Sequence, residues 1–423
     1  MPSGSAGEVS GLPQTAARAG VSLRRRRPFG LGVGLVVFAC VVALLDSSLI
    51  SVLPPLLPAY VRQFGIGSGL AGVLSASYSV GLLFGALPAG LLIARIGQRA
   101  VVALALLVLA VSSVVFGFAG SFEAVVAART VEGVASAFAW TATLAWLASV
   151  SLPVQRARLF GLVFGTAFAG FTLGPVLGAI AARVGTDVVF SVFALVAACA
   201  AVVAFTFVAA GRPQQRPLAA YRSLVVQPGI PYALWLQAMP GFLAGSIGVV
   251  AALRLSGLGA STSTIAAVFL VGGAVQAGAS ALAGGWTDRV GPLRPIRAGF
   301  LAAALLIAAT GLLERVALLG ASVALALGTT AWVLTPATAA LTTGVERAGE
   351  DSSLGFALMN LAFAPGAILG AVLAGVLRDT AGDGTALGVV ALVCVATALV
   401  PARLALPIEH AKQRSAVESG SQP

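Results

Sequence analysis

Residues Ala127–Ser136 read AARTVEGVAS and place an arginine and a glutamate inside a run that is otherwise apolar. A charged side chain at the centre of a membrane costs roughly 2.5–3.5 kcal/mol on insertion scales, so it is kept only where it has a partner or water. Both the fold and the function therefore depend on whether this run crosses a membrane. The composition of the whole chain answers that question.

The composition is that of an integral membrane protein. Charged residues make up 9% of the 423 residues and hydrophobic residues 59%, whereas a typical soluble domain contains about 25% charged residues. Repeated apolar runs of about 20 residues indicate membrane-spanning helices. The net charge of +11 is spread over short loops and tails. Since no soluble domain presents a basic face, nucleic-acid binding is excluded.

The residues that usually support catalysis or metal binding are scarce. Cys40, Cys199 and Cys394 lie within apolar runs, so we interpret them as small buried hydrophobes, not as disulfide or zinc ligands. The only histidine is His410 and the only lysine is Lys412, both in the C-terminal tail. Phosphate-binding loops of the Walker type need a lysine after their glycines. We therefore expect no enzyme activity, no metal site and no cofactor.

Twelve apolar runs are predicted to be membrane-spanning helices, arranged as two sets of six. Those of the first set lie at about 30–56, 69–93, 100–119, 122–149, 158–182 and 187–210, and those of the second at about 231–256, 262–286, 296–313, 316–343, 353–377 and 385–406. The expected fold class is all-α, with twelve transmembrane helices in two pseudo-symmetric six-helix bundles. The expected divisions are a basic tail 1–28, an N-terminal bundle 29–210, a linker 211–230, a C-terminal bundle 231–406 and a tail 407–423.

The basic residues support this count of spans. Cytoplasmic loops carry an excess of lysine and arginine. With the N-terminus placed in the cytoplasm, nineteen basic residues fall on the cytoplasmic side, five fall outside, and Arg129 is left within the membrane, which accounts for all 25. A missed or invented span would invert every later loop and remove the asymmetry. We therefore predict a multi-pass protein of the cell inner (plasma) membrane with both ends in the cytoplasm.

The two halves repeat each other, and several segments match known motifs. The segment GLLIARIGQR at 90–99 of the first half corresponds in position to GGWTDRVG at 284–291 of the second. In the same way, GPVLG at 174–178 corresponds to PGAILG at 365–370. A duplicated six-helix unit is a common transporter construction. With RTVEG at 129–133 on the fourth span, GFTLGPVLG at 170–178 on the fifth and LDSSLISVLP at 45–54 on the first, the sequence resembles the major facilitator superfamily, in its drug:proton antiporter-like branch.

The resemblance implies roles for two groups of glycines and charged residues. It implies that the loops after the second and eighth spans form a cytoplasmic gating motif, which here comprises Gly90, Arg95, Gly97, Arg99, Asp288, Arg289 and Gly291. Ala94 replaces the aspartate of the family's loop, so gating is expected to rest on Arg95, Arg99 and Asp288. Gly170, Gly174 and Gly178 recur every four residues and form a small-residue face for close helix packing, with Pro175 adding a kink.

Three ionisable residues are predicted within the membrane, all in the first half: Asp46, Arg129 and Glu132. A rise of about 1.5 Å per residue places Asp46 and Arg129 at similar heights in a core roughly 30 Å thick, with Glu132 one turn deeper. Ser136 and Trp140 fall almost in line with Arg129 on the same helix face. We therefore expect Arg129 to form a charge pair with Asp46, and Glu132 to share the same wet cavity.

These residues fit proton coupling, or else a structural charge network. Burial favours the protonated form of a carboxyl group and a nearby arginine favours the charged form, so a conformational change can bind or release a proton. The alternative is a network that only orients the first and fourth spans. In the second half, cavity lining and helix–helix hydrogen bonding are both open interpretations for Gln237, Gln276 and Asn360.

The sequence thus predicts a secondary transporter that works by alternating access. We expect proton-coupled efflux of small amphipathic or drug-like molecules, with the substrate, protons and lipid as its partners and a monomer as its oligomeric state. Two alternatives stay open: a transporter of a specific metabolite such as a sugar or amino acid, and a non-transporting membrane receptor. The site is expected at Asp46, Arg129, Glu132, Ser136 and Trp140, with Gln237, Gln276 and Asn360 opposite.

Overall fold

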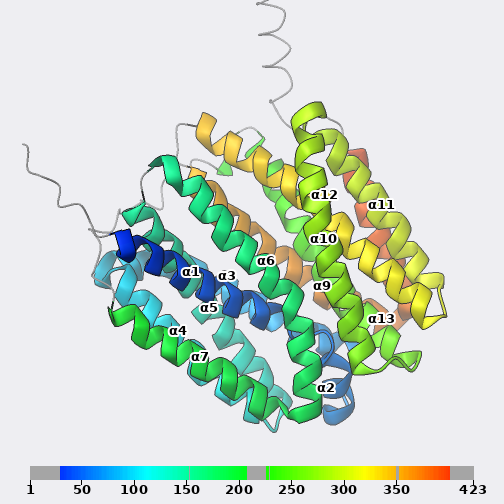
Figure 1. Ribbon diagram of the computed structural model, residues 1–423. Helices are drawn as coiled ribbons and strands as arrows, with labels where there is room; N and C mark the ends of the chain where they lie inside the picture. The colour runs from blue at the N-terminus through cyan, green and yellow to red at the C-terminus, as the bar shows by residue number, and fades with distance from the viewer. Residues whose placement is uncertain (1–28, 152, 207–224, 228, 349–351, 401–423) are drawn as a thin grey trace, which may run out of the picture.

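The computed structural model describes residues 29–151, 153–206, 225–227, 229–348 and 352–400 of the chain, and all the regular secondary structure in these residues is helical (Figure 1). The helices are α1 (Phe29–Ser51), α2 (Leu57–Phe64), α3 (Ser68–Ile96), α4 (Gln98–Phe118), α5 (Phe122–Val150), α6 (Pro153–Val184), α7 (Thr186–Thr206), α9 (Ile230–Gly257), α10 (Thr262–Val290), α11 (Leu293–Leu312), α12 (Val316–Arg347) and α13 (Ser352–Leu399). The predicted tails, and most of the linker 211–230, lie outside the described residues.

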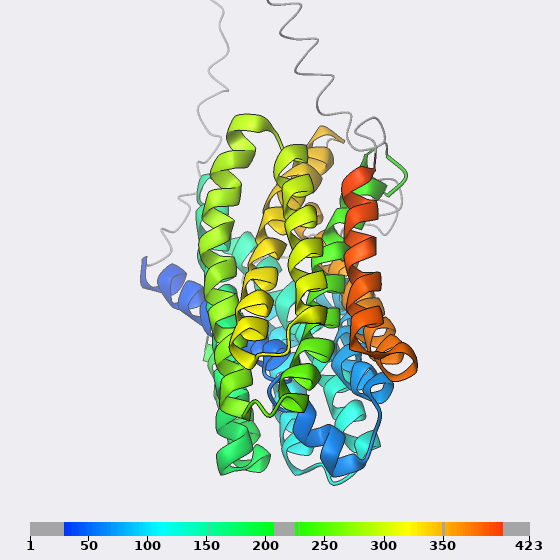
Figure 2. The same ribbon diagram turned by 90° about the vertical axis from the view of Figure 1, so that its right-hand side faces the viewer.

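Eleven of the described helices are long and apolar enough to cross a membrane. The last of them, α13, contains 48 residues and reverses direction at Gly382, whose φ of 83° and ψ of 172° are not helical. It therefore supplies two segments that run in opposite directions, and the second of them is the orange-red helix at the right of Figure 2. The twelve predicted transmembrane helices in two six-helix sets are thus confirmed.

The first span ends earlier than its apolar run. Helix α1 ends at Ser51, before Pro54 and Pro55, because proline has no backbone N–H to continue the helix. The chain then turns and forms α2, a separate helix of 8 residues with a left-handed glycine, Gly65, at its C-terminus. The predicted run 30–56 is therefore one helix and a turn, and hydropathy gave no sign of the break.

The chain forms two halves, α1–α7 and α9–α13, that repeat each other in detail. Gly97 joins α3 to α4 with a φ of 83°, and Gly291 joins α10 to α11 with a φ of 81°. Gly185 and Gly382, with φ values of 109° and 83°, turn the chain at the corresponding loops between the last two spans of each half. These positions favour glycine because other residues are strained at positive φ.

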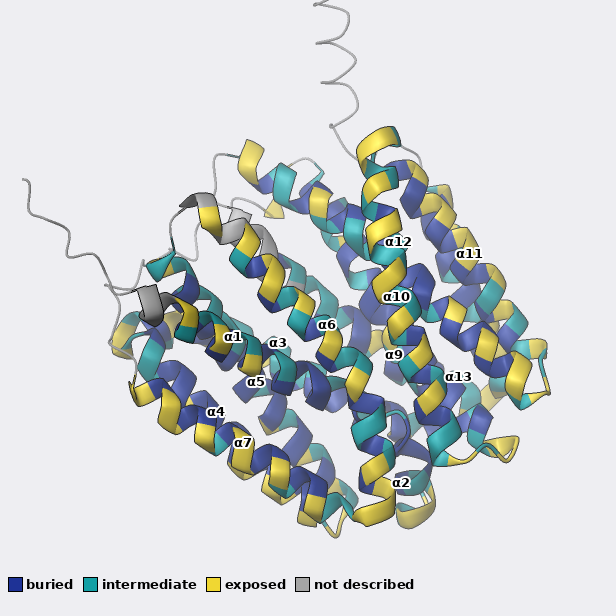
Figure 3. Cartoon of the chain, viewed as in Figure 1, coloured by how far each residue is buried: buried dark blue, intermediate teal, exposed yellow. Residues whose placement is uncertain are grey.

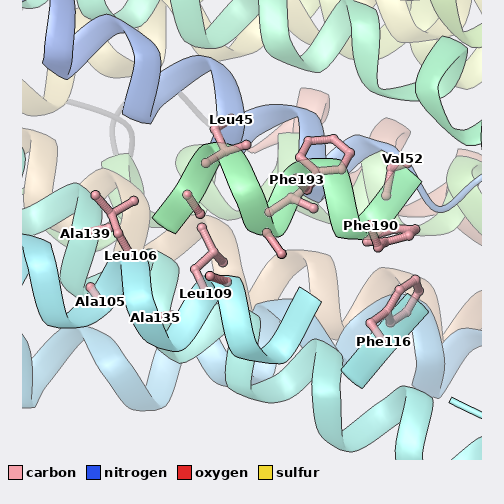
Figure 4. Close-up of a cluster of buried hydrophobic side chains, with 14 of the residues drawn as sticks. Leu45, Val52, Ala105, Leu106, Leu109, Phe116, Ala135, Ala139, Phe190 and Phe193 are labelled. Carbon is pink, nitrogen blue, oxygen red and sulfur yellow. The ribbon is translucent and has the colours of Figure 1, made fainter. Parts of the chain in front are cut away.

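Each half has its own apolar core. The core of the first half draws on α1 to α7, and Val249, Leu253 and Ala371 of the second half pack into it. The core of the second half draws on α9 to α13. In the first half, Phe116 faces Phe190 with ring centroids 4.4 Å apart (Figure 4). The side chains between helices are buried, whereas apolar side chains on the outward faces are exposed, as membrane-facing residues are (Figure 3).

The two halves are joined at one end of the bundle. This end carries the loops at 65–67, 119–121, 185, 258–261, 313–315 and 382, which the charge distribution predicts to lie outside the cell, and we call it the outer end. Arg62 donates to Ser256 (3.3 Å) and Arg183 donates to Ser263 (2.7 Å), in both cases across the halves. In the part of the chain that the structure describes, the hydrogen bonds between the halves all lie at this end. The outer end is therefore closed.

A further contact between the halves joins the carboxylate of Asp379, on α13, to the N-terminus of α3. The backbone N–H groups of Ser68 and Gly69 donate to Asp379 at 2.8 and 2.7 Å, and Arg378 donates to the Ser68 hydroxyl at 2.5 Å. A negative charge at a helix N-terminus satisfies free N–H groups and interacts favourably with the helix dipole. Asp379 thus holds α3 of one half against α13 of the other.

Close backbone packing and two linked ion pairs support the contact between α3 and α13. A Cβ atom on Gly72 would overlap the carbonyl oxygen of Ala371, and one on Gly375 would overlap that of Ser68, so α3 and α13 touch backbone to backbone. Arg378 also binds Asp383 (2.5 Å), which binds Arg254 (3.0 Å). The closed outer end is therefore anchored to two helices of the second half, α9 and α13.

Replacing Asp379 with alanine is expected to open the outer end more often. Loss of a helix cap costs about 1 kcal/mol, which corresponds to roughly a fivefold change in an opening equilibrium. In a chain whose three cysteines are replaced by serine and whose buried Val249 is replaced by cysteine, a membrane-impermeant maleimide added outside should label Asp379→Ala roughly fivefold faster. Asp187→Ala removes the same charge at the start of α7 and is the matched control. Equal labelling rates would contradict the role of Asp379.

Candidate functional site

The buried charges of the first half centre on Arg129, on α5. Its side chain is 1% exposed, and its Nη1 donates to the Leu49 carbonyl oxygen and to Glu132 Oε2, both at 2.9 Å. Leu49 lies near the C-terminal end of α1, where the helix stops supplying donors to its own carbonyls. Arg129 therefore pins α5 to the end of α1 while it balances a negative charge.

Glu132 is enclosed as completely as Arg129. Its side chain is 0% exposed; Oε2 pairs with Arg129, and Oε1 accepts a hydrogen bond from the Ser113 hydroxyl on α4 at 3.0 Å. Both carboxylate oxygens thus have partners inside the protein, and a buried ion pair is stable only when its remaining hydrogen-bonding groups are satisfied in this way. The expectation that Glu132 lies in a wet cavity is not supported by this enclosure.

Asp46 is the second buried carboxylate, and its surroundings are different. It is 5% exposed, and Oδ1 accepts a hydrogen bond from the Tyr78 hydroxyl on α3 at 2.9 Å. The expected charge pair between Asp46 and Arg129 is wrong, because the guanidinium pairs with Glu132 instead. Glu132 is one turn away on the same helix, and such a local pair needs no particular rotation of α1 against α5. Among the described residues, Asp46 has no ion-pair partner.

Tyr78 connects Asp46 to the ion pair. The Arg129 guanidinium lies over the Tyr78 ring, 4.8 Å from its centroid, and 5.6 Å from the centroid of Phe116. A cation over an aromatic face is attracted by the ring quadrupole, more strongly where water is absent. Tyr78 therefore contacts Arg129 with its ring and Asp46 with its hydroxyl, so one side chain of α3 touches both charged groups.

Two glycines bring α3 and α5 close enough for this contact. A Cβ atom on Gly133 would overlap the backbone carbonyl oxygen of Tyr78, and one on Gly81 would overlap that of Thr130. The helices thus meet backbone to backbone at the level of the site, a packing that small residues permit in membranes. Gly133 is the last residue of the RTVEG motif, so the motif supplies the ion pair together with the close packing beside it.

The polar residues on the same face of α5 as Arg129 continue along the helix, away from the outer end. Ser136 and Thr143 are buried and Trp140 is half-buried, and the polar atoms of all three lack a hydrogen-bond partner among the described residues. Ser136 lies beside both Asp46 and Tyr78 without meeting hydrogen-bond geometry. Trp140 packs edge-on against Phe164 of α6. One face of α5 therefore carries three buried hydrogen-bond donors, of which Ser136 lies beside Asp46.

The candidates from the second half hold helices together. Gln237 on α9 donates to Thr338 on α12 at 2.9 Å, and Gln276 on α10 donates to Thr330 on α12 at 2.8 Å. Both contacts agree with helix–helix hydrogen bonding, one of the two interpretations left open. Gln237 Oε1 is buried and has no partner among the described residues, so this acceptor stays available. Asn360 lies on α13, but its side chain falls outside the described residues.

The structure places the residues of the helix-packing motif and of the gating motif as follows. On α6, Gly170, Gly174 and Gly178 lie against α1, where a Cβ atom on each would overlap Leu44, Ser51 and Val52 respectively, and Pro175 lies inside the helix. At the end opposite the outer end, Arg99 bonds the Phe205 carbonyl of its own half. The remaining gating residues lie at the ends of the helices around Gly97 and Gly291: Gly90, Arg95, Asp288 and Arg289. Arg95, Asp288 and Arg289 are at least partly exposed.

Sequence reasoning missed three members of the site: Tyr78, Ser113 and the Leu49 carbonyl. Tyr78 and Ser113 each lie within an apolar run and belong to no motif. A tyrosine in mid-span could have been selected as a buried polar group that needs a partner. Which helix supplies that partner depends on how the helices are rotated, and the sequence does not give this rotation.

The geometry defines a polytopic membrane protein in which the carboxylate of Asp46, without an ion-pair partner among the described residues, lies between helices. Residues 36–343 match the Major Facilitator Superfamily, and the chain belongs to this family of transporters, which are not enzymes.

Relatives and solved structures agree with this family. Over 175 residues the chain is 26% identical to Multidrug resistance protein 2 of Bacillus subtilis (strain 168), an alignment that takes in 41% of this chain and 40% of that relative. The alignment thus spans less than half of the curated relative. Among solved structures, a bacterial homologue of the human lysosomal transporter Spinster, inward-facing and unoccupied, superposes with a TM-score of 0.72 at 14% identity, covering 90% of this chain and 96% of that one. A D-xylose-proton symporter superposes with a TM-score of 0.70 at 17% identity, covering 87% and 96%.

Gly133→Ala is expected to destabilise the protein by roughly 1–3 kcal/mol, because the added methyl group must force α3 and α5 apart. Gly165→Ala is the matched control, since a Cβ atom on that helical glycine meets nothing within 4 Å. Thermal unfolding of the two variants in the same detergent measures the difference. A Gly133→Ala protein that unfolds at the wild-type temperature would contradict the backbone contact at Tyr78.

The Arg129–Glu132 pair is expected to respond to mutation as a unit. Arg129→Met leaves Glu132 buried and unpaired, which costs about 3–5 kcal/mol, whereas replacing both partners with apolar residues is often nearly neutral. Arg129→Met with Glu132→Leu should therefore unfold at a higher temperature than Arg129→Met alone. If the double variant is less stable than the single one, Glu132 stabilises the protein through its bond from Ser113 and not through charge balance with Arg129.

Proposed function

We propose that the protein is a proton-coupled exporter of small amphipathic cations, in which a proton and the substrate cation compete for Asp46. The observation that carries this proposal is the contrast between the two carboxylates. Glu132 is balanced by Arg129 and bonded by Ser113, while Asp46 has a single neutral donor, Tyr78. Asp46 therefore has an uncompensated charge that either a proton or a cationic group can neutralise.

The surroundings of Asp46 suit an amphipathic ligand. The donors of Ser136, Trp140 and Thr143 continue along α5 from the carboxylate, and Trp140 and Phe164 add aromatic surface. Ligand sites are typically apolar and aromatic with a few polar groups that fix orientation. The relative named for multidrug resistance supports the same substrate class, although the identity is 26% over part of the chain.

The closed outer end fits one step of such a cycle. In the state described here, the bonds of Asp379, Arg62 and Arg183 join the halves on the outer side. The site then exchanges with the cytoplasm, where a cation replaces the proton on Asp46. When the outer end opens, a proton from outside displaces the cation, and the protonated site returns. The membrane proposed for this cycle is the plasma membrane, with both chain ends in the cytoplasm and a monomer as the working unit.

One observation favours the alternative of a specific neutral metabolite. Gln237 Oε1 is a buried acceptor on the half opposite Asp46 and has no partner among the described residues. A site that hydrogen-bonds a hydroxyl group from both sides would use such an acceptor. The test below therefore includes sugars among the compounds.

Asp46→Asn is expected to abolish coupled transport. In everted membrane vesicles, where respiration acidifies the lumen, a pH-sensitive dye should report proton efflux when an amphipathic cation such as tetraphenylphosphonium is added to wild type. The amide that replaces the carboxylate carries no negative charge and does not titrate in this range, so the response should disappear. Glu123→Gln, a carboxyl-to-amide change in the first turn of α5, is the matched control.

Two outcomes would reject the proposal. A full proton response in Asp46→Asn would exclude Asp46 as the coupling group. Transport of labelled sugars without any cation-induced proton movement would favour the metabolite transporter, and Gln237→Leu should then lower that transport.

A further inference from the structure

We propose that Tyr78 is the positioning residue that sets the proton affinity of Asp46 and links it to the Arg129–Glu132 pair. This inference deepens the proposed function, on which it rests, by assigning the group that controls the coupling carboxylate. Tyr78 touches both charged groups at once: its hydroxyl donates to Asp46 at 2.9 Å, and its ring lies under the Arg129 guanidinium at 4.8 Å.

The Tyr78 hydroxyl favours the ionised form of Asp46. A hydrogen bond to a charged acceptor is roughly twice as strong as one between neutral groups. Tyr78 is a donor whose strongest interaction is therefore made when Asp46 is charged. Protonation of Asp46 weakens this bond and releases the hydroxyl to other acceptors. The proton affinity of Asp46 thus depends on whether Tyr78 stays within reach, and a movement of α3 relative to α1 changes it.

The charged and titratable groups around Asp46 are few. Tyr78 faces it from α3, and Arg129 and Glu132 from α5, with the neutral Ser136 between them. Helices α6 and α7 also pack against α1, and within the described residues their charged side chains, Arg158, Arg183 and Asp187, lie near the helix ends. Since Arg129 is already paired with Glu132, Tyr78 makes the one direct bond to Asp46 in the described part of the chain.

The backbone fixes Tyr78 to the ion-pair helix. Gly133 and Gly81 hold α3 against α5 with no room for a Cβ atom, so Tyr78 is carried with α5. Asp46 belongs to α1, which packs against α6 through Gly170, Gly174 and Gly178. The bond between Tyr78 and Asp46 therefore crosses between two tightly packed helix pairs. A shift of one pair against the other stretches this bond, together with the bond from Arg129 to the Leu49 carbonyl, while the contacts within each pair stay intact.

The arrangement also explains how Arg129 and Asp46 interact without an ion pair. A guanidinium over the ring attracts electron density and makes the phenol a better donor, so the positive charge acts on Asp46 through Tyr78. A proton on Asp46 can then come and go without breaking the Arg129–Glu132 pair, whose loss would leave two buried charges unbalanced. Proton exchange is thereby separated from the stability of the helix pair α3–α5.

Infrared titration of the full-length protein in lipid nanodiscs tests the role of Tyr78 without any substrate. The carboxylic-acid carbonyl band that is lost in Asp46→Asn reports protonation of Asp46. Tyr78→Phe keeps the ring under Arg129 and removes the donor. Because the removed bond favours the ionised form, protonation becomes easier and the titration midpoint should move towards alkaline pH. The expected shift is about one pH unit, a tenfold change in proton affinity.

Tyr60→Phe is the matched control. Tyr60 lies on α2, its ring stacks on Phe64 and contacts Phe116, and its hydroxyl has no hydrogen-bond partner among the described residues. The same atom is removed in both variants, but only Tyr78→Phe breaks a bond to Asp46. The Tyr60→Phe titration should therefore superimpose on that of wild type.

The possible results separate the inference from the proposed function. If the Asp46 band titrates at the same pH in wild type and Tyr78→Phe, Tyr78 does not set the proton affinity, while Asp46 stays the coupling group. If wild type shows no band that Asp46→Asn removes, Asp46 does not exchange protons, and the proposed function fails. A shift equal in Tyr78→Phe and Tyr60→Phe would mean that the effect is not specific to the Asp46 bond, and would overturn the inference.

Discussion

A charge that is buried away from water must be balanced where it lies, and this constraint organises the first half of the protein. Arg129 forms an ion pair with Glu132, whose other carboxylate oxygen accepts a hydrogen bond from Ser113. Arg129 also donates to the carbonyl oxygen of Leu49 near the end of α1. The bonds to Ser113 and to Leu49 join two different helices to α5. The contacts of α1 and α4 with α5 at this level thus stabilise a buried ion pair in a low-dielectric interior, although Nε of Arg129 has no hydrogen-bond partner among the described residues.

Sequence patterns predicted the helices well but predicted the contacts between them less well. Hydropathy and the basic loops predicted twelve spans. Eleven helices supply them, because α13 reverses direction at Gly382 and provides two. The break after Ser51 was missed because Pro54 and Pro55 lie in a run that is apolar throughout. Depth along two helices predicted that Asp46 and Arg129 lie at similar heights, yet not how the helices are rotated. A partner on the same helix, Glu132, took the guanidinium, and a tyrosine without a motif, Tyr78, took Asp46.

The site and the closed outer end share one helix. Helix α3 begins at the N–H groups held by Asp379 and carries Tyr78 about ten residues further along, so its start belongs to the contact between the halves and its middle to the carboxylate. A rigid helix transmits a displacement of one end to the other. In the proposed cycle, opening of the outer end and stretching of the Tyr78–Asp46 bond result from one movement of this helix. Under the proposed function, this is the physical connection between access and proton binding.

The uneven distribution of charge between the halves has a consequence for how such a protein changes over time. The fully enclosed charged side chains at mid-span, Asp46, Arg129 and Glu132, all belong to the first half. The ion pairs of the second half among the described residues, formed by Arg254, Asp383 and Arg378, lie at the outer end, and its mid-span contacts are made by neutral groups such as Gln237 and Thr338. Substitutions in the second half leave the buried charge balance untouched, so they meet a lower energetic barrier than those around Arg129. Single neutral replacements can therefore accumulate in α9–α13, while the buried charge network of the first half is inherited unchanged.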